Sequence, residues 1–153
     1  MSDAEKIIWA AFGAVAVYVA GQLLSRFFID RLYELRKTIG EVRFNLSFHA
    51  PTINTPIGRS KETSDAAKDA LRKNSSDLIA KLDSVPLYAA VRILSFGTFP
   101  SRKDIEAAAV QLRGLSTYVH EDGPKANEHL DVISKRIAKI KQLLRLRPLE
   151  EEK

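Results

Sequence analysis

The sequence predicts an all-α fold, in which one N-terminal transmembrane helix continues into a cytoplasmic helical bundle. Three observations lead to this prediction. Residues 7–24 carry no charge, although charged residues make up 28% of the chain. From residue 28 onward, apolar residues recur at intervals of three and four, which places them on one face of a helix. No segment alternates apolar and polar side chains convincingly, so no strand is expected.

The 153 residues of the chain allow one membrane segment and one modest domain. We divide them into a transmembrane anchor (1–29), a cytoplasmic helical domain (30–147) and a disordered acidic tail (148–153). As a helix, residues 7–24 span about 27 Å, close to the roughly 30 Å thickness of the hydrocarbon layer. A secretory signal peptide is the competing interpretation, but the residues before the apolar stretch are net acidic and large residues follow it.

Flanking charge predicts the orientation of the anchor. Only Lys6 precedes it, whereas five basic residues follow: Arg26, Arg31, Arg36, Lys37 and Arg43. By the positive-inside rule, a single-pass protein of the bacterial inner membrane would place its N-terminus outside and its C-terminal domain in the cytoplasm.

One face of the anchor is small or polar. It carries Ala14, Tyr18, Gln22 and Ser25 at spacings of three and four. Such stripes mark helix–helix contacts in membranes, because lipid gives apolar faces no reason to associate. The sequence therefore favours a homo-oligomer, with Tyr18 and Gln22 towards a central axis. A monomeric anchor that tolerates one glutamine is the alternative.

Beyond the anchor, the first helix is expected to run on to Pro51, with a loop over 50–60. A second helix is expected over 61–84. Pro86 fits the first turn of a short helix over 86–96, which is apolar nearly all round and is interpreted as the buried centre of the bundle. A membrane-surface or re-entrant segment is the alternative interpretation of this short helix.

Two further helices complete the predicted bundle. The first begins with Ser101 as its N-cap and Asp104 in its first turn, and residues 120–124 end it with a turn. The second covers 125–147 and repeats apolar residues at a heptad-like spacing before Pro148 stops it.

The sequence contains no pattern that indicates catalysis. Phosphate-binding glycine loops, a zinc-binding H-E-x-x-H motif and a nucleophile elbow are all absent. The chain has no cysteine, and its three histidines, at positions 49, 120 and 129, stand singly. We therefore expect no enzyme, no cofactor and no metal site.

Basic residues are the stronger functional signal, because the net charge is +5. Three explanations remain open: a solvated helix face, attraction to anionic lipids, or an anionic ligand such as a nucleotide or a short nucleic acid. The candidate ligand-binding residues are Arg43, Asn45, His49, Arg59, Lys61, Arg102, Lys103, Arg136 and Lys139. Asn45 and His49 are included because aromatics Phe44 and Phe48 beside them would suit nucleobase stacking. The simpler interpretation is that these polar residues cap a helix and shape a proline turn.

Three stretches resemble segments of small bacterial proteins that have one N-terminal span. They are F-x-L-x-F-x-A before a proline (44–51), an apolar P-L-Y helix (86–96), and P-x-x-x-D-I-x-x-A followed by G-L-S (100–116). The overall layout also resembles the Hailong-type membrane effectors of anti-phage defence. That resemblance implies an oligomeric channel, which is restrained by short DNA made by a partner nucleotidyltransferase.

Two functions of different classes follow. The first is an oligomeric inner-membrane effector that forms an ion channel gated by an anionic ligand, such as an oligonucleotide. The alternative is a membrane-tethered helical scaffold that recruits a protein partner or lipid.

Overall fold

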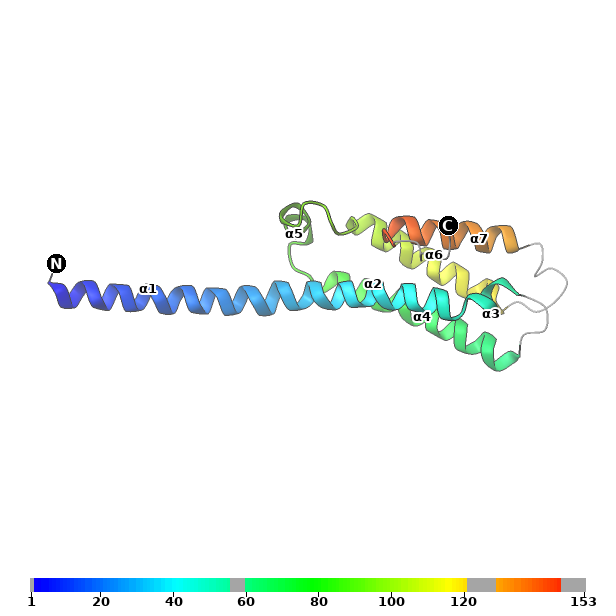
Figure 1. Cartoon of the computed structure of the whole chain (residues 1–153), viewed down its shortest axis with the longest axis horizontal. Coiled ribbons are helices and arrows are strands. Elements are labelled where there is room, and N and C mark those ends of the chain that lie inside the picture. Colours follow the sequence, from blue (N-terminus) through cyan, green and yellow to red (C-terminus); the bar gives the residue numbers. More distant parts are fainter. Residues whose placement is uncertain (1, 56–59, 121–128, 147–153) are drawn as a thin grey trace.

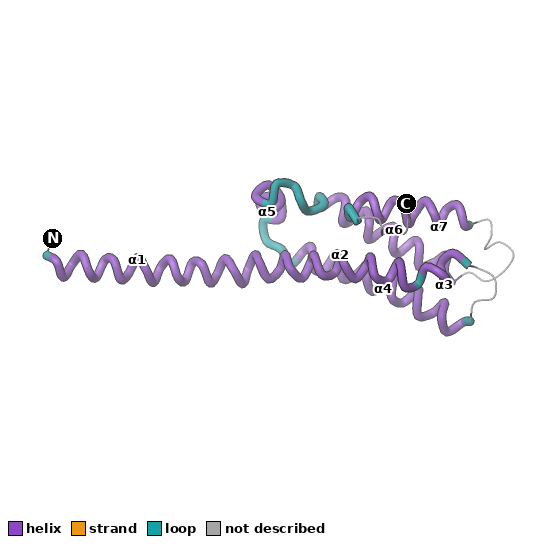
Figure 2. Tube along the Cα trace, in the orientation of Figure 1, coloured by secondary structure: helices purple, strands orange, loops and turns teal. Residues whose placement is uncertain are grey.

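The computed structural model describes residues 2–55, 60–120 and 129–146. Within these ranges the regular elements are all helical, so the predicted all-α class is confirmed (Figures 1 and 2). Helix α1 (Asp3–Leu24), the π-helical turn η1 (Ser25–Ile29) and α2 (Asp30–Phe48) form one continuous helix. This helix is long and apolar enough to cross a membrane, and its α1 part projects away from the bundle (Figure 1).

The bundle consists of α2, α4 (Lys61–Asp83), α6 (Arg102–His120) and α7 (Leu130–Leu143). Helix α4 packs against both α2 and α6, and α7 packs against α6. Their apolar faces meet in one core, whose largest fully buried side chains include Leu35, Val42, Leu71, Leu78, Leu82, Ile105, Leu112, Leu115, Ile133 and Ile140. The helical faces expected from three- and four-residue spacing are therefore confirmed.

Serine side chains begin α4 and α6. The Ser60 hydroxyl accepts a hydrogen bond from the Thr63 amide at 3.2 Å. At the start of α6, the Asp104 amide donates to the Ser101 hydroxyl at 3.1 Å, and the Ser101 amide donates to the Asp104 carboxylate at 3.0 Å. These reciprocal bonds satisfy amides that have no partner inside the helix, and they confirm the expected cap.

The segment after α2 differs from the expected loop. Helix α2 does end before Pro51, but α3 (Ala50–Asn54) follows at once and buries Ile53 completely. Proline fits the first turn of a helix, where its missing amide hydrogen has no intrahelical partner anyway. Pro51 therefore follows the end of α2 and also occupies the first turn of α3. Residues 56–59 of the expected loop lie outside the described residues.

The prediction of a buried short helix is wrong. Helix α5 (Tyr88–Leu94) is shorter than expected; its Tyr88 and Val91 belong to the core, whereas its Ile93 is 78% exposed. Leu87 and Phe96, which flank it, are exposed and have left-handed backbones with φ of 50° and 51°. Such a conformation costs a non-glycine residue about 1–2 kcal/mol. The sequence of a short helix that is apolar all round does not show which face is buried. In α5, one apolar face is buried and another is exposed.

The last helix is described from Leu130 to Leu143. Its expected beginning at Lys125, the turn over 121–124, and its expected end at Arg147 lie outside the described residues, as does the tail over 148–153. The buried Ile133, Ile140 and Leu144 confirm its predicted apolar seam.

Candidate functional site

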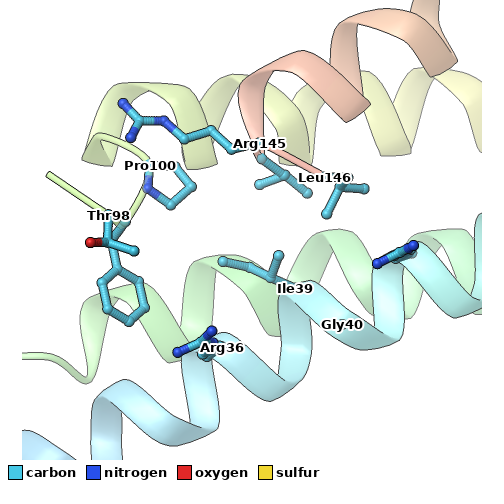
Figure 3. Close-up of a pocket in the computed structure, with 10 residues that line it drawn as sticks. Arg36, Ile39, Gly40, Thr98, Pro100, Arg145 and Leu146 are labelled. Carbon is cyan, nitrogen blue, oxygen red and sulfur yellow. The ribbon is translucent and has the colours of Figure 1, made fainter. Parts of the chain in front are cut away.

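An open groove of about 490 Å³ lies between α2, the segment that follows α5, and the C-terminal end of α7. Its lining residues come from three separate parts of the chain: Arg36, Ile39, Gly40, Arg43, Thr98, Phe99, Pro100, Leu144, Arg145 and Leu146. In Figure 3, Arg36 lies on the α2 side, Arg145 extends beside Pro100 on the opposite side, and Ile39 and Leu146 lie between them. We refer to this site as the arginine groove.

Helix α2 forms one wall of the arginine groove. Arg36 and Arg43 are seven residues apart, which is two helical turns, so they project from the same face. Ile39 and Gly40 lie between them. Nothing stands within 4 Å of where a Cβ of Gly40 would be, so the space between the two arginines is open.

The end of α7 forms the opposite wall. The Leu146 amide donates to the Lys141 carbonyl at 2.9 Å, which closes the helix with a Schellman-type turn. Arg145 occupies the left-handed position of this turn, with φ of 54°, where glycine is usual. Its guanidinium donates a hydrogen bond to the Gly97 carbonyl and so ties α7 to the segment after α5.

The arginine groove combines positive charge with apolar walls. Neither Arg36 nor Arg43 forms an ion pair with a carboxylate of the described residues. Arginine keeps its charge at every relevant pH, and its planar fork suits phosphate or carboxylate oxygens. The side chains of Phe99 and Leu144 add apolar surface. The arrangement suits an anion that carries an apolar or aromatic part.

Electrostatics at the rim agree with this description. The pKa of Asp104 is lowered, first by the hydrogen bonds from Ser101 and further by the charges of Arg145 and Arg92. Neither arginine forms an ion pair with Asp104 among the described interactions, so their effect on its carboxylate acts through space. The positive field of the groove thus extends to the first turn of α6.

The predicted ligand residues are not brought together at one place. Arg43 lines the arginine groove, whereas Lys61 begins α4 and Lys139 lies exposed on α7. Arg59 lies outside the described residues. The eight predicted residues that the structure describes therefore belong to several distinct surfaces.

Asn45 and His49 have structural partners. The Asn45 side-chain amide donates to Oδ1 of the Asn74 side chain at 3.2 Å and so links α2 to α4. His49 ends α2, and its ring lies edge-on to Phe48 with centroids 5.0 Å apart. Partial burial lowers the pKa of His49, which favours its neutral form. The simpler interpretation of this polar segment, that it shapes a helix end, fits these contacts.

Arg102 and Lys103 lie at the start of α6, beside α5. Arg102 pairs with Asp83 and with Glu106, the latter at 3.0 Å. Arg102 and Lys103 also line a second groove of about 500 Å³, together with Arg92 and Leu87. This groove is separate from the arginine groove in its lining residues.

Arg136 is held inside the bundle. Its Nη1 donates to the Gln111 side chain at 2.8 Å, and its guanidinium lies over the Tyr118 ring at 5.4 Å from the centroid. A Cβ on Gly114 would stand 2.5 Å from that same Nη1, so the absence of a side chain there makes room for the guanidinium. These contacts join α7 to α6.

The number and positions of basic residues in the sequence did not identify Arg36 and Arg145 as parts of one site. The two-turn spacing of Arg36 and Arg43 was a readable signal, because i and i+7 share a helix face. The position of Arg145 was not readable, since it depends on a left-handed turn at a non-glycine residue and on how α7 packs.

The predicted helix-packing face lies on α1 and η1. Ala14, Tyr18 and Gln22 are exposed, and Ser25 begins the π-helical turn. The Gln22 side-chain amide donates to the Tyr18 hydroxyl at 3.4 Å, so the two polar groups partly satisfy each other. Among the residues of α1, none is buried by the rest of the chain.

The π-helical turn changes which α2 residues share this face. The Asp30 amide donates to the Ser25 carbonyl, five residues back, so the turn accommodates one extra residue. With that offset, and about 100° per residue elsewhere, Tyr33, Phe44 and Phe48 fall within about 40° of Tyr18. Phe44 and Phe48 stack at 5.5 Å and are 63% and 66% exposed. The polar face of α1 therefore continues as an exposed aromatic face on α2.

Comparison with known proteins finds no matching family model, curated protein or solved structure.

Proposed function

We propose that the protein is a single-span inner-membrane effector whose copies associate into an ion channel controlled by an anionic ligand in the arginine groove. The observation that carries this proposal is the continuous helix from Asp3 to Phe48. It bears the Tyr18–Gln22 face at one end, and Arg36 and Arg43 of the groove at the other. A ligand that moves α2 would therefore move the span directly.

The exposure of α1 supports membrane insertion. Its 22 residues bury no side chain against the bundle, so this chain gives its apolar surface no protein cover. A contiguous apolar surface of this kind is costly in water, and about 20 apolar residues are the length that a bilayer requires. The basic residues that follow favour a cytoplasmic position for the bundle.

The polar face of α1 supports self-association. In lipid, side chains such as Gln22 gain by hydrogen-bonding across a helix contact. The continuation of this face into Tyr33, Phe44 and Phe48 offers the copies a second stretch of contact outside the bilayer. A π-helical turn lies between the two stretches, and such turns are frequent at functional sites.

The ligand is proposed to be a nucleotide or a short oligonucleotide. Three arginines can contact phosphates, while Phe99 and the aliphatic side chains can contact a base or a sugar. The resemblance to anti-phage effectors suggests a partner nucleotidyltransferase as the source of such a ligand. An anionic lipid head group shares the same chemistry and is distinguished by the binding experiment in the Discussion.

The channel is tested by expression of the protein in bacteria while a voltage-sensitive dye reports the inner-membrane potential. The parent is expected to depolarise the membrane, and Gln22→Leu is expected to remove the depolarisation without loss of insertion. Val17→Leu, on another face of α1, is the matched control and should behave as the parent. An unchanged depolarisation in Gln22→Leu would contradict the pore assignment.

The exposed Phe44–Phe48 pair favours a second candidate, a membrane-tethered scaffold that binds a protein partner through α2. This candidate requires α1 only as an anchor. Replacement of residues 7–29 by an unrelated transmembrane helix would then preserve function. Loss of function in an inserted chimaera would favour the channel.

A further inference from the structure

Three large apolar side chains around α5 are exposed where the bundle would face the membrane. Leu87 is 73% exposed, Ile93 78% and Phe96 98%, whereas Tyr88 and Val91 of the same segment are buried. The segment thus presents one apolar side to the core and a second one outward. Three large apolar side chains left exposed within one short segment favour a binding surface.

The backbone around α5 holds two of these side chains outward. Leu87 precedes the helix and Phe96 follows it, and both have left-handed backbones, which side chains larger than glycine rarely adopt. The turn at Phe96 is fixed by a hydrogen bond from the Gly97 amide to the Arg92 carbonyl at 2.9 Å. The fold therefore maintains an unfavourable local conformation at both ends of the segment and leaves the large side chains uncovered.

The segment lies at the end of the bundle from which α1 projects (Figure 1). Two bonds hold it there: the Tyr88 hydroxyl donates to the Pro100 carbonyl at 2.8 Å, and Arg145 donates to the Gly97 carbonyl. Thr98 and Phe99, which follow it, line the same groove as Arg36. Arg36 comes seven residues after the predicted end of the anchor, which is about 10 Å along a helix and close to the lipid head groups.

The charge around the segment suits an anionic lipid surface. Residues 84–103 contain three basic residues, Arg92, Arg102 and Lys103, and no acidic residue, although Arg102 is paired with Asp83 and Glu106, which lie outside this range. All three line the second groove beside Leu87. Outward apolar side chains surrounded by basic residues are the pattern of segments that lie in the membrane interface.

We propose that α5 and its flanking turns dock on the cytoplasmic leaflet of the membrane that α1 crosses, with Leu87, Ile93 and Phe96 among the lipids. This proposal rests on the membrane crossing proposed for α1. The span and α5 then attach the bundle at two points, which fixes its tilt relative to the membrane. The arginine groove is held next to the leaflet by the same attachment, since Arg145 contacts both the groove and Gly97.

The test uses the full chain in nanodiscs that contain phosphatidylglycerol. The chain has no native cysteine, so Phe96→Cys can be labelled at one site with an environment-sensitive fluorophore. Val110→Cys, an exposed apolar position on α6, is the matched control, and Val15→Cys reports insertion of α1. Leu87→Cys supplies a second reporter in case one substitution disturbs the turn.

Lipids with a nitroxide on a shallow acyl carbon are expected to quench the labels at Phe96 and Leu87 at least threefold more than the label at Val110. A water-exposed, unquenched signal at both α5 positions would overturn the proposal. A blue-shifted but unquenched signal would overturn it too, because it would place these residues against another protein surface. A second lipid, with its nitroxide deep in the acyl chain, should quench the label at Val15, which lies midway along residues 7–24. A Val15 label that this deep nitroxide does not quench would show that α1 is not inserted, and would overturn the membrane crossing together with the docking.

Discussion

Arg36 and Arg43 on α2 differ in their surroundings from Arg136, which lies at the contact between α6 and α7. Arg136 bonds to Gln111 and stacks on Tyr118, in a space that Gly114 leaves open. Arg36 and Arg43 line an open groove, and no carboxylate of the described residues pairs with them. A charged hydrogen-bonding group that already has its partners stabilises the fold, whereas one that faces an open groove is available to a ligand. The comparison separates an arginine with structural partners from arginines that are open to a ligand within one bundle.

The largest expected effect is on ligand binding in the arginine groove. Arg36→Gln with Arg43→Gln removes two charge-assisted contacts, each of about 1.5–3 kcal/mol, so binding of a short phosphorylated oligonucleotide should weaken by at least about 100-fold. Fluorescence anisotropy of a labelled oligonucleotide on the protein in nanodiscs measures this change. The affinity of the parent should also fall steeply as salt rises.

Arg72→Gln with Lys73→Gln is the matched control, because it removes the same charge from an exposed face of α4. It should weaken binding only slightly. Nanodiscs of purely zwitterionic lipid distinguish the source of the anion: oligonucleotide binding that persists there belongs to a soluble ligand. Binding of anionic lipid alone, with no oligonucleotide binding, would contradict the proposed ligand and leave a lipid site.

The second effect concerns stability. Arg136→Ala should lower the free energy of unfolding of the bundle by about 2 kcal/mol, since it removes a charged hydrogen bond and a cation–π contact and leaves Gln111 without that partner. Denaturant unfolding in detergent, followed by circular dichroism, measures this loss. Oligonucleotide binding should change less than about threefold. A variant that unfolds as the parent does but no longer binds would reverse the assignment of Arg136.

Gly114→Ala provides the control for that contact. Alanine is favoured over glycine within a helix by about 0.5–1 kcal/mol, so the substitution should stabilise the Arg136→Ala variant by that amount. In the parent the gain should be smaller, because the new methyl group would displace the guanidinium. Equal gains in both backgrounds would show that Arg136 does not sit against α6.

Helical faces could be predicted from the sequence, but the groove and the exposure of α5 could not. Residues such as Leu71, Leu112 and Ile140 recur with the helical period, and that period follows from backbone geometry alone. Helix α5 has no polar face, so its pattern contained no information on which side is covered. The groove requires Arg145 from the turn that ends α7 and Arg36 from α2, and only tertiary packing brings the two together.

Asp104 is an intermediate case, because the charge of Arg145 lowers the pKa of its carboxyl although these two described residues form no ion pair. Its pKa is lowered mainly by Ser101, and then by Arg145 and Arg92. A carboxyl whose pKa is lowered by folding adds stability above its unfolded value of 3.8, and this stability is lost as the pH falls through the lower folded value. Arg145→Gln should raise the pKa of Asp104 towards its unfolded value, so this contribution should be smaller and its loss should be complete at a higher pH than in the parent. Arg145→Lys keeps the charge and should leave the pH profile of stability unchanged.

Nuclear magnetic resonance titration of the Asp104 side chain measures the shift of its pKa directly. If the pKa of Asp104 were the same in the parent and in Arg145→Gln, the positive field of the groove would not reach α6, and the capping bonds from Ser101 alone would account for the lowered pKa.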